Sequence, residues 1–165
     1  MFIMNARAFL ERENDGQTEL VLQTRNKPNE PKTLELPGGR MELYEPVLDA
    51  LRREVMEETG LTVTEVLGES NRIDTESISP QFAVECVQPF CAYQTIHGPF
   101  DSIGLYFLCR TEGELLASGD EAKGAAWVPV AEIRRMMERD PLQFSNVDRA
   151  RLMYYLRHRG LEGKE

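Results

Sequence analysis

The sequence lacks the features that would place it in a membrane or outside the cell. No apolar run approaches the ~20 residues that a membrane-spanning helix requires. Residues 1–7 show neither the basic leader nor the apolar stretch of a signal peptide. We therefore expect a cytoplasmic protein without a membrane partner.

Positive charge is also in short supply. Lys and Arg number 19 against 28 Asp and Glu, which gives a formal net charge of -9. An acidic surface repels polyanions, so this composition argues against a nucleic-acid polymer as partner. A small phosphate-containing substrate remains compatible with the charge if metal ions supply the positive counterpart.

Cysteine is scarce as well. Cys86, Cys91 and Cys109 are odd in number, lie within apolar runs and form no CxxC pair. This pattern argues against a disulfide framework and against a thiolate zinc site. We interpret all three as reduced core residues.

What is present fits one globular domain, residues 1–165, with 41% hydrophobic residues. Alternating and helical patterns, bounded by turn and cap residues, predict the elements of the chain. Strands are expected at 2–10, 19–24, 33–36, 61–67, 82–96, 103–110 and 125–128, and helices at 46–59, 130–139 and 146–159. This order predicts an α+β fold in which helices pack on a mixed β-sheet as a three-layer sandwich.

Local signals mark several boundaries. Residues 37–39, Pro-Gly-Gly, predict a tight turn that ends the third strand. Pro46 suits the first turn of a helix, and Gly60 suits the left-handed residue just past its end. The segment 97–101 has the composition of a loop between two antiparallel strands.

The expected central helix concentrates acidic residues on one face. At ~100° per residue, Glu54, Glu57 and Glu58 fall within an arc of about 100° and within ~6 Å along the axis. Apolar positions occupy the adjoining arc, so the acids border the core. Because these like charges repel, a divalent cation would stabilise them, and oxygen-only ligands suit Mg²⁺ or Mn²⁺ better than Zn²⁺. The alternative is a solvated helix in which Arg53 pairs with Glu57.

The spacing around this helix resembles the signature of the Nudix hydrolase family, G-x5-E-x7-R-E-U-x-E-E-x-G-U, where U is aliphatic. All nine specified positions match within residues 39–61: Gly39, Glu45, Arg53, Glu54, Val55, Glu57, Glu58, Gly60 and Leu61. The resemblance implies a Nudix-type α/β/α sandwich with a central catalytic helix. It also implies hydrolysis of a diphosphate linkage by metal-activated water.

The resemblance implies a role for each matching residue. Glu57 and Glu58 would be the principal metal ligands, and Glu54 a further ligand or the general base. Arg53 would hold the glutamates in place, and Gly39 would let the backbone pass close to the metal and offer its carbonyl. Glu45 would support the turn and its metal, although a helix-capping carboxylate beside Pro46 explains it equally well.

A later acid is a further candidate. Asp120 and Glu121 lie in a segment that resembles the family's late loop, where an extra carboxylate often reaches the metals. We favour Glu121, with a solvated turn as the alternative. The general base is therefore Glu54, Glu58 or this downstream acid.

Substrate signals are weaker. The subfamily motifs for NADH, dinucleoside polyphosphates, ADP-ribose and coenzyme A are missing, and Tyr44, Phe90, Tyr93 and Phe100 are aromatic residues for which we assign no role. A basic patch on the last helix, comprising His158 with Arg149, Arg151, Arg157 and Arg159, fits either a phosphate tail or an acidic partner, or else a solvated face.

Taken with the resemblance, these observations predict Mg²⁺-dependent hydrolysis of a nucleoside diphosphate linked to another group, with a nucleoside triphosphate or nucleotide sugar favoured. One alternative is a catalytically silent domain that binds a nucleotide as a sensor or scaffold. Another is an isomerase or other enzyme on the same fold. The apolar segment 82–110 is compatible with a homodimer interface and equally with a buried core.

Overall fold

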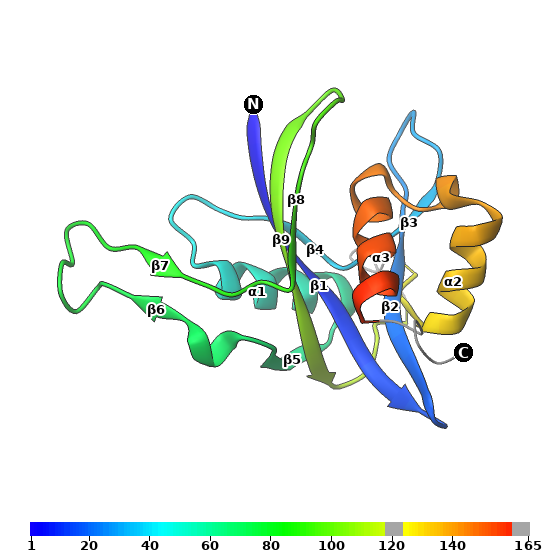
Figure 1. Cartoon of the computed structure of the whole chain (residues 1–165), viewed down its shortest axis with the longest axis horizontal. Helices are drawn as coiled ribbons and strands as arrows, with labels where there is room; N and C mark the ends of the chain where they lie inside the picture. Colours follow the sequence, from blue (N-terminus) through cyan, green and yellow to red (C-terminus); the bar gives the residue numbers. More distant parts are fainter. Residues whose placement is uncertain (118–123, 160–165) are drawn as a thin grey trace.

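The computed structural model describes residues 1–117 and 124–159 of the chain. Within these residues a mixed β-sheet lies between α1 and the pair α2 and α3 (Figure 1). The helices are α1 (Val47–Thr59), α2 (Val130–Arg139) and α3 (Asn146–His158), with short 3₁₀ turns η1 (Glu69–Asn71) and η2 (Pro141–Gln143). The strands are β1 (Phe2–Asn14), β2 (Gln17–Arg25), β3 (Thr33–Glu35), β4 (Gly38–Arg40), β5 (Thr62–Val66), β6 (Ile73–Asp74), β7 (Glu85–Cys86), β8 (Cys91–Gln94), β9 (Asp101–Glu112) and β10 (Ala126–Pro129).

The main sheet runs in the order β10-β2-β1-β9-β5, with β3 added to β2, β4 to β1 and β8 to β9. Strands β1 and β9 pair in parallel from Phe2↔Asp101 to Leu10↔Cys109, and the other pairs of this sheet are antiparallel. β6 and β7 form a separate two-stranded ribbon. The mixed sheet expected from the sequence is therefore confirmed.

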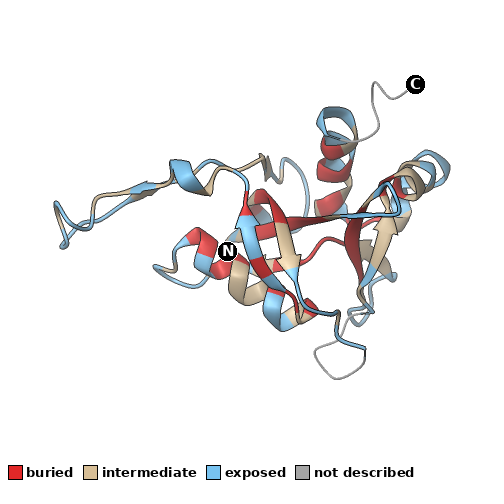
Figure 2. Ribbon diagram, turned by 90° about the horizontal axis from the view of Figure 1, so that it is seen from below, coloured by how far each residue is buried: buried red, intermediate tan, exposed pale blue. Residues whose placement is uncertain are grey.

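The sheet has a buried core on each face because its central strands are apolar on both sides. In β1, Ala6, Ala8 and Leu10 join the cluster that includes α1, whereas Phe9 joins the cluster that includes α2 and α3. The same alternation divides the buried residues of β9. The result is the α/β/α sandwich that the family resemblance implied (Figure 2).

The opening hairpin is longer than predicted. β1 continues to Asn14 and β2 begins at Gln17, so that only Asp15 and Gly16 form the turn. Both residues have positive φ, 49° and 76°, as a two-residue type I′ turn requires.

Helix α1 begins and ends close to the predicted positions. Pro46 directly precedes its first residue, Val47, and Gly60 closes it in the left-handed conformation at φ 77°. A Cβ on Gly60 would also lie 2.9 Å from Cγ of Leu116, so both conformation and space favour glycine.

The prediction of a tight turn at residues 37–39 is wrong. Gly38 to Arg40 form strand β4, which pairs with β1 through Ala6↔Gly39 and Arg7↔Gly38. Gly38 has φ 132°, and a Cβ there would lie 2.5 Å from the Ala6 carbonyl oxygen. These glycines permit close approach to β1 and do not reverse the chain at this point.

The predicted strand at 82–96 is also wrong in its first half. Its ordered pairing with β9 begins only at Cys91, and the preceding residues form one side of the β6–β7 ribbon. Phe82 is 79% exposed and Val84 57% exposed. Cys86 is exposed, which corrects its prediction as a core residue, whereas Cys109 is buried. Apolar composition predicted burial, but local pairing with 73–74 carries this segment away from the sheet.

None of the helices within residues 1–117 and 124–159 is long and apolar enough to cross a membrane.

Candidate active site

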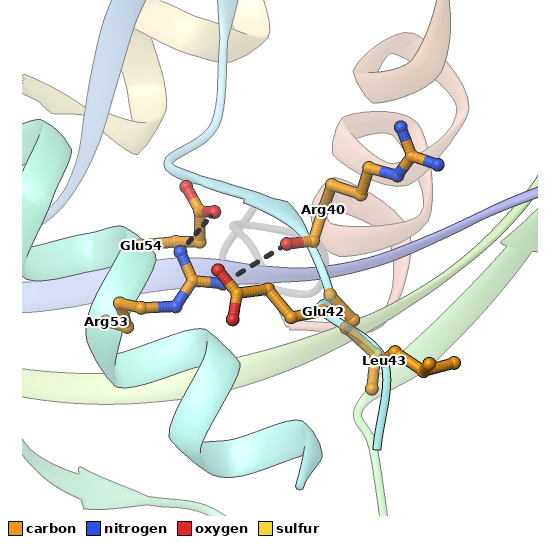
Figure 3. A pocket seen from close by; sticks show the side chains of 6 residues that line it. Arg40, Glu42, Leu43, Arg53 and Glu54 are labelled. Atoms are coloured by element: carbon orange, nitrogen blue, oxygen red, sulfur yellow. Dashed lines mark hydrogen bonds and ion pairs between the residues drawn. The ribbon is translucent and has the colours of Figure 1, made fainter. Parts of the chain in front are cut away.

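The acidic residues of the central helix meet strand β4 at one end of the sheet. Glu54, Glu57 and Glu58 lie on consecutive turns of α1, and Gly39 of β4 faces Glu54. This juxtaposition follows from the β1–β4 pairing, which brings the glycine strand beside the helix. A pocket of about 420 Å³ opens here, lined by Arg40, Met41, Glu42, Leu43, Arg53 and Glu54 (Figure 3).

Arg53 connects the acids of this site. Its Nε and Nη2 donate to the two carboxylate oxygens of Glu45, at 2.8 and 2.9 Å, and its Nη1 donates to Glu54 at 2.8 Å. A longer bond of 3.3 Å joins Nη2 of Arg53 to the Arg40 carbonyl (Figure 3). Another of 3.5 Å joins Nη1 of Arg53 to Glu57. The Arg53–Glu57 pair of the solvated-helix alternative is therefore present, but Arg53 lies closer to Glu45 and Glu54 than to Glu57.

The surroundings of Glu45 and Glu54 shift the pKa values of these two carboxyls in opposite directions. Hydrogen bonding from Arg53 lowers the pKa of Glu45 below its ordinary value. Burial raises the pKa of Glu54, and the bond from Arg53 only partly offsets this effect. The Glu45 hydrogen bond also raises the pKa of Arg53, so the guanidinium stays charged.

Glu45 supports the turn before the helix. Its carboxylate accepts the Glu42 backbone N–H at 2.9 Å in addition to the bonds from Arg53. The first backbone N–H of α1, at Val47, donates instead to Glu85 at 2.8 Å. Glu85 therefore occupies the capping role that the sequence offered as one account of Glu45.

Gly39 and Glu54 are in close contact. A Cβ built on Gly39 would lie 2.5 Å from Oε2 of Glu54, a distance at which one of the two must move. The side chain of Glu54 is 16% exposed, so its carboxylate sits between β4 and the helix. A larger residue at position 39 would therefore displace the Glu54 carboxylate, which agrees with the close backbone approach that the resemblance implied.

Glu58 is held from the opposite side by residues that the sequence did not single out. Its Oε2 accepts a hydrogen bond from Nε2 of Gln23 at 2.7 Å and from the Gly38 backbone N–H at 3.0 Å. Gln23 is fully buried in β2. The available signal was its strand position: Gln23 lies two residues after Val21 and shares its inward face, where a polar residue needs a partner.

The remaining predicted residues do not all join this site. Asp120 and Glu121 lie outside the described residues. The predicted basic patch on the last helix is wrong as a single surface, because Arg151 is 2% exposed and its guanidinium lies over the rings of Tyr93 and Tyr106. Arg159 pairs instead with Glu11 at 3.1 Å.

The donor set suits a hard divalent cation. Carboxylates of Glu54, Glu57 and Glu58 and the backbone at Gly39 offer oxygen ligands only, which favour Mg²⁺ or Mn²⁺. Over residues 1–117 and 124–159, no three His, Cys, Asp or Glu side chains are already arranged around a common metal position. The three carboxylates come from one helix, and their hydrogen-bond partners in this structure include Arg53, Gln23 and Gly38.

Comparison with known families identifies the fold and its class. The NUDIX domain model matches residues 1–147, most of the chain. The chain therefore belongs to the NUDIX family, and the predicted class, a Nudix pyrophosphohydrolase, is confirmed. Enzymes of this family act on nucleoside diphosphate derivatives and generally use divalent metals. No match is found among curated protein sequences.

Solved structures share the fold at low sequence identity. A MutT NUDIX hydrolase from Burkholderia pseudomallei is 18% identical, with 93% of this chain and 97% of that chain covered and a TM-score of 0.63. The E. coli ORF135 protein is 20% identical, with coverages of 99% and 95% and a TM-score of 0.63. The NUDIX domain of Shewanella oneidensis NrtR, in complex with ADP ribose, is 15% identical, with coverages of 96% and 88% and a TM-score of 0.65.

Proposed function

We propose that this protein is a Mg²⁺-dependent pyrophosphohydrolase that cleaves the diphosphate linkage of a nucleoside diphosphate derivative, with a nucleoside triphosphate or nucleotide sugar favoured. The observation that carries the proposal is the contact between Gly39 and Glu54, where a Cβ would lie 2.5 Å from the carboxylate. This contact shows that strand β4 lies against the helix that carries the three glutamates, in a protein whose family hydrolyses such linkages.

Glu54, Glu57, Glu58 and the backbone of Gly39 would hold the metal, with Mn²⁺ as a substitute for Mg²⁺. When bound, the ion would neutralise the phosphate oxygens and lower the pKa of the attacking water. Glu57 is the most accessible of the three acids, with its side chain 53% exposed. It is therefore free to turn toward a ligand at small cost.

The chain's own groups would orient this chemistry. Glu54 or Glu58 would accept the proton of the attacking water, which then bonds to phosphorus as the bridging oxygen leaves with the second product. Arg53 fixes Glu54 through a charge-assisted bond of 2.8 Å, and Glu45 fixes Arg53 through two more. Glu121 remains a candidate for a further carboxylate at the metals.

A nucleotide-binding domain without turnover is the alternative. The fold neighbour from NrtR has been crystallised with ADP ribose, which makes ADP-ribose a suitable ligand to include in a binding panel. The complete set of box glutamates favours hydrolysis over this alternative. An isomerase on the same fold would yield a rearranged product without loss of a phosphorylated fragment.

The test is a nucleotide panel containing nucleoside triphosphates, nucleotide sugars and ADP-ribose, assayed for Mg²⁺-dependent release of phosphorylated products. We expect turnover of at least one compound and its loss in Glu57→Gln. Tight nucleotide binding without turnover in the wild-type protein would support the silent domain instead. Full activity of Glu57→Gln would contradict the metal assignment whichever substrate was found.

A homodimer is also part of the proposal. Its support is the β6–β7 ribbon, whose exposed apolar side chains include Ile73, Ile78 and Phe82, at 68%, 83% and 79% exposure. Light scattering on the full chain would measure the mass directly. A monomer at concentrations well above those of the activity assay would contradict the dimer.

A further inference from the structure

A buried glutamine fixes the orientation of Glu58. Nε2 of Gln23 donates to Oε2 of Glu58 at 2.7 Å, and the Gly38 backbone N–H donates to the same oxygen at 3.0 Å. Gln23 has no exposed surface. Because a buried amide rarely changes its partners, the rotamer of Glu58 is set from within the sheet as well as from α1.

The position of Gln23 is itself fixed by a neighbouring strand. Gln23 and Glu35 are direct cross-strand partners in the β2–β3 pair, so their side chains lie on the same face. Nε2 of Gln23 donates to Oε1 of Glu35 at 3.2 Å, and Glu35 is 1% exposed. A single amide nitrogen thus bridges two carboxylates, one buried behind it and one at the site.

The choice of a neutral amide has an electrostatic consequence. Arg53 orients Glu54 with a positive charge, which also opposes the approach of a cation. Gln23 orients Glu58 without adding any charge beside it. A carboxylate has about four acceptor positions, so the two bonds from Gln23 and Gly38 do not by themselves exhaust its capacity for a metal.

We propose that Gln23 is a positioning residue for Glu58, that Glu35 anchors it from behind, and that this pair presets Glu58 for divalent-metal binding. The inference rests on the proposed function, since it takes Glu58 as a metal ligand. Partners that orient metal ligands typically change metal affinity by about 10–100-fold when they are removed.

The test is titration of Mn²⁺ into the nucleotide-free full chain by calorimetry. Gln23→Met preserves side-chain length and removes the amide, and we expect it to weaken Mn²⁺ binding by about tenfold or more. Because this change leaves Glu35 buried without its amide donor, the double variant Gln23→Met with Glu35→Met is measured beside it. Glu35 also pairs with Arg25 at 3.7 Å, but Arg25 keeps Glu30 as a partner at 3.1 Å. Replacing Gln23 and Glu35 together by apolar groups of similar shape is less destabilising than leaving one of them without the other, so the double variant should fold and show the same loss of affinity.

Gln143→Met is the matched control. Nε2 of Gln143 donates to the Met136 and Asp140 carbonyls, away from the α1 glutamates. We expect it to lower stability modestly and to leave the Mn²⁺ dissociation constant unchanged. If the double variant folds and binds Mn²⁺ as tightly as the wild-type protein, the positioning role of Gln23 is overturned.

Glu58→Gln separates this inference from the proposed function. If Glu58→Gln binds Mn²⁺ as tightly as the wild-type protein, Glu58 is not a ligand and the inference about Gln23 is overturned with that assignment. If Glu58→Gln weakens binding while both Gln23 variants retain the wild-type constant, only the inference about Gln23 is overturned. Weakened binding in all three variants supports both.

Discussion

The glutamate site on α1 and the β6–β7 arm, defined as residues 68–90, differ in which groups they turn inward. At the site, charged side chains lie between elements and accept bonds from Arg53, Gln23 and Gly38. Along the arm, Ile78 and Phe82 point outward with 83% and 79% of their surface exposed. Figure 2 shows the arm as mostly exposed beside a buried sheet.

The two regions are nevertheless joined through one helix. Arg52 pairs with Glu69 at the base of the arm at 2.7 Å, and Glu85 accepts the Val47 N–H at the start of α1. The arm thus leaves the body beside the N-terminal half of the helix that carries the acids (Figure 1). We conclude that contacts at the base of the arm should affect the stability of α1, whereas the tip of the arm should affect neither stability nor catalysis in the monomer.

The largest contrast between the regions should appear in catalysis. We expect Glu54→Gln to lower kcat by roughly 10²–10⁴-fold, because it removes one of the carboxylates that we propose bind the metal and accept the proton. The same chemical change on the arm, Glu76→Gln, should change kcat by less than about twofold, since Glu76 lies far along the exposed ribbon. Steady-state kinetics on one substrate from the panel measure kcat for both variants. Equal losses of kcat would contradict the difference between the site and the arm.

Gly39→Ala tests the packing of the site. The added Cβ would lie 2.5 Å from Oε2 of Glu54, so either the carboxylate or β4 must shift. We expect a loss of about 1–3 kcal/mol in the free energy of unfolding and a fall in kcat that can reach about 10²-fold. Chemical denaturation and kinetics check the two effects. Wild-type activity in Gly39→Ala would show that the contact is dispensable.

A smaller effect is expected at the base of the arm. Glu85→Ala removes the acceptor of the Val47 N–H at the start of α1 and should cost about 1 kcal/mol of stability. At protein concentrations where the chain is monomeric, Phe82→Ser at the exposed tip should stay within about 0.5 kcal/mol of wild type. Thermal unfolding of both variants under identical conditions measures the difference. A larger loss for the tip variant would mean that the tip is buried in solution, as a dimer would require.

The smallest predicted effects are on the pH dependence of stability. The contributions of Glu54 and Glu45 to this dependence have opposite signs. Glu54 has a raised pKa, so the stability it contributes is present below about 4.5 and is lost as the pH rises through its folded value. Glu45 has a lowered pKa, so its contribution is present above about 4.5 and is lost as the pH falls through its folded value. In metal-free protein near neutral pH, Glu54→Gln should therefore be more stable than wild type and Glu45→Gln less stable.

Unfolding in chelator across pH 3–7 checks this pair. The difference in unfolding free energy between each variant and wild type should shrink as the pH falls. For Glu54→Gln it shrinks first, because the Glu54 carboxyl of the wild-type protein protonates at the higher pH. For Glu45→Gln it shrinks only below about pH 4.5. If both variants changed stability in the same direction, this would contradict the opposite effects of burial on the pKa of Glu54 and of the Arg53 bond on the pKa of Glu45.

The sequence predicted those parts of the fold whose signals are local. Helix α1 was predicted within one residue because Pro46 and Gly60 mark its two ends. The arm was missed because an apolar run carries no mark that distinguishes exposure from burial. Cys86 shows the result, since its apolar neighbourhood predicted a core position and it is exposed.

The same difference between local and distant signals applies to the site. Spacing along one helix gathered Glu54, Glu57 and Glu58, but their partners come from distant segments. Gln23 lies 35 residues before Glu58, and Glu85 lies 38 residues after Val47. Which inward polar residue meets which helix depends on strand order and register, and these follow from the packing of the whole sheet.

The most direct test of the central claim is the position of Mn²⁺ in a crystal of the full chain, located by its anomalous scattering. The account predicts a peak about 2.1 Å from carboxylate oxygens of Glu54, Glu57 or Glu58, beside the Gly39 carbonyl. A fully occupied peak elsewhere, with Arg53 still bound to Glu54 and none of the three acids in contact with metal, would contradict it.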